Sequence, residues 1–295
     1  MTEIFGIPLS AFLSQLLLGL VNGSFYAMLS LGLAVIFGML NIINFAHGAL
    51  YMMGAFAAWM GGEYLGLSYW WMLILAPLAV GLVGVVIERT MLQWLYKLDH
   101  LYGLLLTFGI TLVAEGIFHS FYGASGQSYP VPELLQGATN LGFVILPNYR
   151  AWVVVASLVV CLAVWALIEK TSLGALLRAG TENPKLVQAF GVNVPRMVTL
   201  TYAGGVALAA FAGVLAAPIL QVSPQMGSSL IIVVFAVVVI GGMGSILGSI
   251  LTGLGLGVIE GLTKVFYPEA SNTVVFLIMA IVLLVRPAGL FGKEK

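Results

Sequence analysis

Residues 31–60 read LGLAVIFGMLNIINFAHGALYMMGAFAAWM, and this stretch decides how the rest of the chain folds. A helix that crosses about 30 Å of hydrocarbon at 1.5 Å per residue needs ~20 apolar residues. The stretch is too long for one plain span, and its polar segment 41–48 interrupts it. We expect one broken helix, two short spans or a re-entrant pair here.

The composition of the whole chain places this stretch in a membrane. Of 295 residues, 61% are hydrophobic and 7% are charged, with 11 Lys and Arg against 11 Asp and Glu. A water-soluble domain normally carries about a quarter of its residues as charged side chains, which keep its surface hydrated. The composition therefore indicates a polytopic membrane protein. A net charge of zero gives no electrostatic case for nucleic acid, and a single cysteine, Cys161, excludes a disulfide framework.

Apolar runs separated by charges, prolines or polar clusters are the candidate spans. They cover residues 9–29, 31–60, 70–87, 103–121, 150–168, 198–218, 229–243, 245–263 and 273–288. The stretch 229–263 is split at 241–245, as 31–60 is split at 41–48. The sequence therefore predicts an all-α fold, a polytopic transmembrane helical bundle with eight to ten spans that include broken or re-entrant helices. We expect it to form a single domain, 1–295.

The positions of the positive charges predict the orientation, because Lys and Arg near span ends are held on the cytoplasmic side. Nine of the 11 fall in three segments: Arg89, Lys97, Lys170, Arg178, Lys185, Arg196, Arg286, Lys293 and Lys295. Only Arg150 and Lys264 lie elsewhere. With those segments inside, the carboxyl terminus is cytoplasmic, the amino terminus is outside and 122–149 is an extracytoplasmic loop.

The longest cytoplasmic segment, 169–197, carries the signals of a short helix. Asn183 is a suitable N-cap, Pro184 fits the first helical position, and Gly191 can end the helix in a left-handed conformation. A second helix would start at Asn193. The apolar side of the first consists of Leu186, Val187 and Phe190. A two-turn helix is unstable alone, so we expect it to pack on the bundle or on a partner, with an ordinary connecting loop as the alternative.

The polar interruptions also resemble the signature of a known family. The run 31–55, with Asn44-Phe45-Ala46-His47-Gly48 at its centre, looks like that of LivH-type permeases, the membrane subunits of ABC importers for branched-chain amino acids. The resemblance continues in order through Leu173-Gly174, Arg178-Ala179, 189–193, 239–245 and 286–292. The Asn-Phe-Ala-His-Gly and Gly-Gly-Met-Gly-Ser elements together are specific to the family.

The resemblance implies a heteromeric importer in a bacterial inner membrane. This chain would lie beside a second homologous permease subunit, two ATP-binding subunits and an extracytoplasmic solute-binding protein. ATP and Mg would be used by the ATP-binding subunits, and this chain would bind no cofactor and be no enzyme. The absence of a Gly-x-x-x-x-Gly-Lys-Ser/Thr motif agrees with that division of labour. No set of catalytic residues or metal ligands stands out.

The resemblance also implies that 171–197 couples the permease to an ATPase. The candidate coupling residues are Glu182, Pro184, Leu186, Val187, Phe190 and Gly191. Permeases of other ABC importers often carry a Glu-Ala-Ala…Gly pattern in this loop. Here Asn183 follows Glu182, so individual ATPase contacts are not carried over.

The two polar breaks are the candidate translocation region. Its residues are Asn41, Asn44, Phe45 and His47 in the first break, and Gly241, Gly242, Gly244 and Ser245 in the second. Polar groups left unsatisfied in lipid are costly, so these groups must face protein, water or the membrane boundary. A broken helix near the midplane would expose backbone groups able to hold the charged ends of an amino acid. The alternative is that Asn44 and His47 tie the break to neighbouring helices.

Carboxylates within apolar runs are further candidates, because such groups are often functional. Glu115 has His119 one turn later, which suggests either a proton relay or a hydrogen-bonded pair that fixes helix packing. We favour the pair, since no further acidic groups continue a relay. Glu63 and Glu260 lie at outer span ends and are expected to be boundary residues.

Other cargos and other classes of membrane protein are alternatives to this assignment. Similar permeases carry urea, short amides or aromatic acids, and the sequence does not discriminate among these cargos. A stand-alone secondary transporter or channel would support gradient-coupled uptake by this chain alone. A membrane-bound enzyme is the weakest alternative, because the sequence shows no catalytic set.

Overall fold

Helices make up nearly all of the secondary structure in the computed structural model, which describes residues 3–4, 7–40, 42–96, 98–142 and 144–292. The helices are α1 (Leu9–Leu40), α2 (Ala46–Leu65), α3 (Tyr69–Thr90), α4 (His100–Tyr122), α5 (Asn148–Lys170), α6 (Ser172–Glu182), α7 (Pro184–Ala189), α8 (Val194–Ala216), α9 (Met226–Gly241), α10 (Ile246–Phe266) and α11 (Val274–Val285). Single 3-10 turns are η1 (Leu92–Trp94), η2 (Glu133–Leu135) and η3 (Pro268–Ala270). Two antiparallel hairpins pair β1 (Glu3–Ile4) with β2 (Ile7–Pro8) and β3 (Ala138–Asn140) with β4 (Ile145–Pro147).

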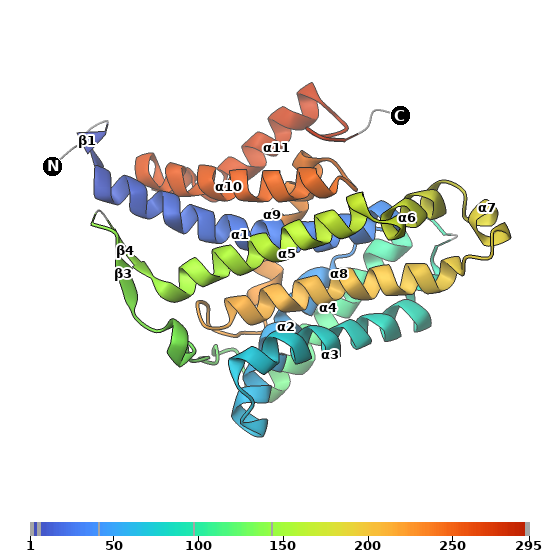
Figure 1. Ribbon diagram of the computed structural model, residues 1–295, viewed down its shortest axis with the longest axis horizontal. Helices are drawn as coiled ribbons and strands as arrows, with labels where there is room; N and C mark the ends of the chain where they lie inside the picture. The colour runs from blue at the N-terminus through green and yellow to red at the C-terminus, as the bar shows by residue number, and fades with distance from the viewer. Residues whose placement is uncertain (1–2, 5–6, 41, 97, 143, 293–295) are drawn as a thin grey trace.

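The longest helices run roughly side by side along the long axis of the molecule (Figure 1). At one end, on the right in Figure 1, lie α6 and α7. Strand β1 and the β3–β4 hairpin lie at the opposite end. The two longest connections between spans are therefore separated by the length of the bundle.

Six helical segments in the described part of the chain are long and apolar enough to cross a membrane. They are Leu9–Leu40, Tyr69–Trp94, His100–Tyr122, Asn148–Lys170, Val194–Ala216 and Ile246–Phe266. The apolar helices α9 and α11 are shorter, with 16 and 12 residues. The chain is thus a multi-pass bundle, while the predicted number of eight to ten spans is not confirmed.

The predicted end of the first span near residue 29 is wrong, because α1 continues without interruption to Leu40. Ser30, at the predicted boundary, fits inside the helix because its hydroxyl lies 3.1 Å from the carbonyl oxygens of both Ala27 and Ser249. At 1.5 Å per residue, the 32 residues of α1 extend about 48 Å. The stretch 31–60 therefore belongs to two helices, and the described residues between them are 42–45.

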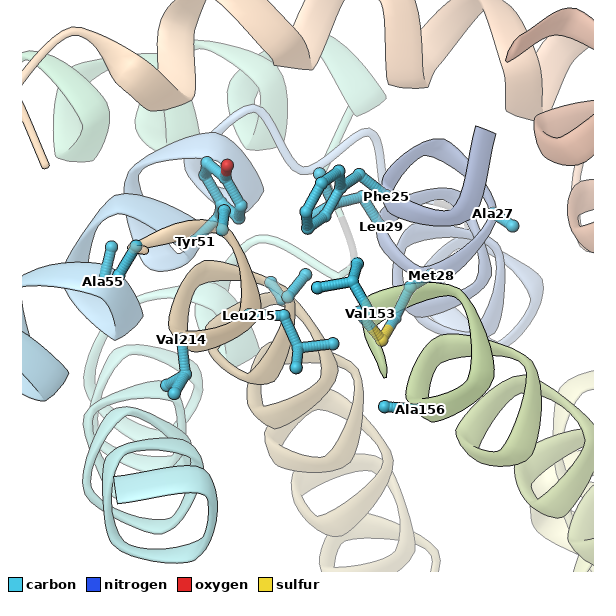
Figure 2. Packing of buried hydrophobic residues seen from close by; sticks show 14 of the residues in the cluster. Phe25, Ala27, Met28, Leu29, Tyr51, Ala55, Val153, Ala156, Val214 and Leu215 are labelled. Carbon is cyan, nitrogen blue, oxygen red and sulfur yellow. The ribbon is translucent and has the colours of Figure 1, made fainter. Parts of the chain in front are cut away.

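Side chains from α1, α2, α5 and α8 meet in the main core of the bundle (Figure 2). Phe25 and Met28 come from α1, Tyr51 from α2, Val153 from α5 and Leu215 from α8, and none is more than 5% exposed. Between helices in lipid there is no hydrophobic driving force, so close packing of this kind holds the bundle together.

Glycines on both helices form the close contact where α1 meets α10. Gly19 and Gly23 of α1 pack against Gly253, Gly257 and Gly261 of α10 or their neighbours. A Cβ atom at Gly257 would lie only 2.2 Å from the Cα atom of Gly23 and 2.5 Å from the carbonyl oxygen of Gly19. The two backbones approach this closely only because both carry glycine.

Two glycines on α8 pack in the same manner. Gly205 faces Ile36 and Gly32 of α1, and Gly213 faces the backbone of Tyr51 in α2. A Cβ atom at Gly213 would lie 2.1 Å from the Tyr51 carbonyl oxygen. Helix α8 is therefore held against both helices that flank the first break.

Replacing Gly257 with Ala should weaken the α1–α10 contact, because the new methyl group overlaps the backbone of Gly23. We expect the free energy of unfolding in detergent to fall by about 1–3 kcal/mol, read as a lower thermal midpoint. Gly255→Ala is the matched control, since nothing lies within 4 Å of a Cβ atom there. Equal midpoints for the two variants would contradict the proposed close packing.

Candidate functional site

The connection between α1 and α2 is non-helical backbone enclosed by other helices. Its residues Ile42 and Asn44 are 4% and 1% exposed. Thr107 of α4 supplies hydrogen bonds to it, because its hydroxyl accepts from the Phe45 N–H at 3.1 Å and lies 3.3 Å from the Ile43 carbonyl oxygen. Gly103, one turn earlier, leaves room for Ile42, whose Cγ2 atom would lie 2.9 Å from a Cβ atom at that position. Irregular backbone at membrane depth is tolerated where protein satisfies it in this way.

Asn44 and His47 point into the bundle and bind neighbouring helices. The Asn44 Nδ2 atom donates to the hydroxyl of Tyr202 in α8 at 3.2 Å. The His47 Nε2 atom lies 3.0 Å from the Leu29 carbonyl oxygen, an acceptor, so this nitrogen carries the proton. Asn44 Oδ1 and His47 Nδ1 are buried without a hydrogen-bond partner among the described residues. Asn41, the other polar residue of this break, lies outside the described residues.

Phe45 lies at the edge of the bundle and joins α4 to α9. Its ring is 6.5 Å from that of Phe108 at 87°, and 6.2 Å from that of Phe235 at 27°. Phe108 is 48% exposed. Of the three candidate pathway residues in the first break that the structure describes, Phe45 is half-buried, whereas Asn44 and His47 are buried.

A polar contact lies farther along the same two helices. The Ser228 hydroxyl of α9 donates to Glu115 Oε1 of α4. The expected Glu115–His119 hydrogen bond is wrong for the described residues, because α9 begins beside α4 and its serine provides the partner, while His119 is exposed. The α4–α9 seam, as we name this face, consists of Phe45, Phe108, Leu112, Glu115, His119, Ser228, Ile232 and Phe235.

Of the two carboxylates expected at span ends, one differs from its prediction. Glu260 is no boundary residue, since it is 6% exposed and accepts from the Tyr26 hydroxyl at 2.7 Å while pairing with Lys264. Tyr26 on α1 and Lys264 one turn along α10 enclose it. Glu63, by contrast, is exposed near the end of α2, as expected.

Sequence reasoning missed Glu88, which is 2% exposed in α3. Its carboxylate accepts from the hydroxyls of Tyr96 and Thr199, both at 2.7 Å, and Arg89 lies 3.8 Å away. These contacts fasten the end of α3 to the start of α8. The available signal was an adjacent Glu–Arg pair at the end of an apolar run.

The second break is a tight turn between α9 and α10 rather than a part of the first. Gly242 and Gly244 have φ angles of +97° and +83°, which only glycine adopts readily. Ser245 caps α10 by accepting from the Gly248 N–H at 3.2 Å. Gly241 lies in the last turn of α9, and its carbonyl oxygen accepts from the N–H of Phe291 in the tail.

The structure does not join the two breaks into one site. Gly242 lies against the tail at Gly289 and Gly292, and Gly244 lies against Gly38 near the end of α1. Asn44 and His47 instead contact Tyr202 and Leu29, as described above. No group of three His, Cys, Asp or Glu side chains within the described ranges is arranged to hold a metal ion.

The segment 171–193 folds into α6 and α7, of which only α7 was predicted. Asn183 caps α7 by accepting from the Leu186 N–H at 3.1 Å, and Gly191 follows it with φ +82°, as expected. Asn193 caps α8 by accepting from the Arg196 N–H, also as expected. The apolar side is divided, with Val187 buried while Leu186 and Phe190 are 53% and 80% exposed.

Removing the hydroxyl of Thr107 should destabilise the first break. In Thr107→Val the side chain keeps its shape, but the N–H of Phe45 and the carbonyl of Ile43 lose this partner. We expect a loss of about 1–3 kcal/mol, measured by thermal unfolding in detergent. Thr107→Ser keeps the hydroxyl and serves as the control. If both variants unfold at the same temperature, this hydrogen bond does not hold the connection.

Comparison with known proteins places these features in a family. The family model described as "Branched-chain amino acid transport system / permease component" matches residues 15–285. The high-affinity branched-chain amino acid transport system permease protein LivH of Escherichia coli is 29% identical over 303 residues, which are 96% of each chain. Protein BraD of Pseudomonas aeruginosa, with the same description, is 31% identical over 299 residues, or 96% of this chain and 97% of BraD.

A second kind of permease also matches. Protein LivM of Escherichia coli, named for the same transport system as LivH, is 28% identical over 294 residues, which are 92% of this chain and 68% of LivM. No solved structure matches the chain. Because the family model covers most of the sequence, including both polar breaks and α6 to α8, this chain belongs to the family of permease components of branched-chain amino acid transport systems.

Proposed function

We propose that this chain is the permease subunit of an ABC importer that moves branched-chain amino acids, leucine, isoleucine and valine, across a bacterial inner membrane. The observation that carries the proposal is the match to LivH and BraD over 96% of this chain. The proposed assembly contains a second homologous permease, two ATP-binding subunits and an extracytoplasmic solute-binding protein. ATP and Mg are used by the ATP-binding subunits.

The distribution of charge supports an orientation with α6, α7 and the carboxyl terminus in the cytoplasm. The cations described near that end of the bundle are Arg89, Lys170, Arg178, Lys185, Arg196 and Arg286. Arg150 begins α5 and Lys264 ends α10 at the other end. Such asymmetry is typical of the cytoplasmic side of a membrane protein.

The exposed side chains of the α7 region support an assignment as the coupling segment. Val187 anchors α7 to the bundle, whereas Leu186 and Phe190 face outward. Gly180 of α6 packs against Met197 at the start of α8. A movement of α7 would therefore reach α8 through α6, which contacts both helices. In this proposal Leu186 and Phe190 dock on the ATPase, and Glu182, Pro184 and Gly191 shape the segment.

For the pathway we propose a division of roles within the first break. Phe45 lines the path, because it is the described residue of that break at an exposed seam. Asn44 and His47 hold it in place through α8 and α1. The second break, Gly241 to Ser245, joins the path only near its cytoplasmic end, where it lies between Gly38 and the tail.

Uptake by reconstituted vesicles tests this function. Liposomes with this chain, the second permease, both ATP-binding subunits, enclosed ATP and external binding protein should accumulate radiolabelled leucine. Liposomes with this chain alone should accumulate none, because the sequence has no phosphate-binding loop. Uptake of urea instead of leucine, or gradient-driven leucine uptake by this chain alone, would refute the proposal.

A charge at Phe190 should uncouple the ATPase. Burial of a phenylalanine side chain contributes about 1.5–3 kcal/mol, so Phe190→Glu should weaken retention of the ATP-binding subunits at least ~10-fold in co-purification. Leu134→Glu is the control, because Leu134 is likewise 80% exposed but lies in the 122–149 loop. Retention of the ATPase by Phe190→Glu equal to that of the control would show that α7 is not the docking site.

A further inference from the structure

The α4–α9 seam places polar groups at a depth where the spans are otherwise apolar. Glu115 lies about two turns, or ~10 Å, before the end of α4. Ser228 lies in the first turn of α9, and its neighbours Gln225 and Ser229 are exposed. Helix α4 is the least buried of the six spans in the described chain. This polar strip therefore faces away from the bundle.

Contact between lipid hydrocarbon and these polar side chains is energetically unfavourable. Ionisable side chains within spans are strongly disfavoured in contact with lipid and normally face a water-filled cavity or another protein. The members on α4 are spaced as Phe108, Leu112, Glu115 and His119, the spacing of one helical face. The polar half of this face, Glu115 and His119, therefore indicates the wall of an aqueous path that a second subunit completes.

Glu115 also lacks a cation among the described residues. The ion pairs there belong to other carboxylates: Glu88 with Arg89, Glu169 with Arg178, and Glu260 with Lys264. Ser228 donates to Oε1 of Glu115, which leaves Oε2 free for a donor from outside the described chain. A primary ammonium group is such a donor and also supplies the missing charge.

The rest of the seam is apolar and lies next to this carboxylate. Leu112 and Ile232 are 54% and 55% exposed, and the ring cluster of Phe45, Phe108 and Phe235 follows toward the start of α4. One face thus offers an anion followed by aliphatic and aromatic surface. An α-amino acid with a branched aliphatic side chain has the matching pair of groups.

We propose that the α4–α9 seam lines the translocation path and that Glu115 contacts the ammonium group of the amino acid in transit. The apolar part of the seam receives its side chain. This inference rests on the proposed function, because it assigns a specificity residue to the path of that importer. Ser228 is the positioning residue that orients the carboxylate.

Water accessibility tests the first half in the assembled importer. In a Cys161→Ala background, Ile232→Cys should react with a charged methanethiosulfonate reagent, because Ile232 belongs to the seam, lies one turn from Ser228 and is 55% exposed. Val159→Cys, at a position that is 60% exposed in the middle of α5, should not react. Absence of labelling at Ile232→Cys would place the seam in lipid or in a dry interface and overturn the proposal.

Transport kinetics test the contact with cargo. Glu115→Gln should raise the KM for leucine uptake about tenfold, while ATP hydrolysis stimulated by the binding protein stays within about twofold of the unmodified importer. Glu115→Asp, which keeps the charge, should recover most of the loss, and Glu269→Gln, an exposed carboxylate in η3, should change nothing. If Glu115→Gln fails to assemble, Ser228→Ala provides the comparison, because it removes the donor that orients the Glu115 carboxylate and should also raise the KM.

The outcomes separate this inference from the proposed function. If the unmodified importer takes up leucine but Glu115→Gln has an unchanged KM, the assignment of Glu115 is wrong and the function stands. If the unmodified importer takes up no leucine, the function itself fails. If Glu115→Gln and Glu115→Asp lose leucine uptake equally and both assemble poorly, Glu115 has a structural role. That result would contradict the proposed contact with the ammonium group.

Discussion

The fold of the bundle requires that the backbone N–H and C=O groups of residues 42–45 find hydrogen-bond partners without water. The Asn44 carbonyl oxygen accepts from the His47 N–H of α2, but the Ile43 carbonyl and the Phe45 N–H have no helical partner, and lipid offers none. The Thr107 hydroxyl supplies the missing partner, because it lies within hydrogen-bond distance of the Phe45 N–H and the Ile43 carbonyl oxygen. Gly103 gives space for the Ile42 side chain. Because Thr107 and Gly103 both belong to α4, these contacts hold α4 against the break. With its preceding backbone hydrogen-bonded in this way, α2 can begin inside the bundle. Phe45 is left at the edge, next to α9.

Glycine-rich contacts on the other side of the bundle leave this region free for function. The α1–α10 and α1–α8 interfaces are so close that they admit no side chain at Gly257 or Gly205. They give the chain a rigid half, whereas α4 stays largely uncovered and carries Glu115. A membrane protein with a polar face of this kind is incomplete alone, which agrees with a permease that works beside a second one.

The sequence predicted those helix ends that depend on the residues at the end itself. Asn183, Asn193 and Gly191 marked the ends of helices because capping and positive φ depend on single residues. The continuity of α1 through Ser30 and the burial of Glu260 were not predictable, because their partners lie more than 200 residues away in sequence. Hydropathy also does not distinguish a helix face against protein from one against lipid, so the α4–α9 seam emerged only from the fold.

The most direct test is an experimental density map of the importer assembled from this chain, a second permease and the ATP-binding subunits in a lipid nanodisc. The account predicts that the α4–α9 seam faces the second permease across a hydrated gap, with Glu115 and Phe45 on its wall. Density for acyl chains lying along that seam, with the second permease bound to a different face, would contradict it.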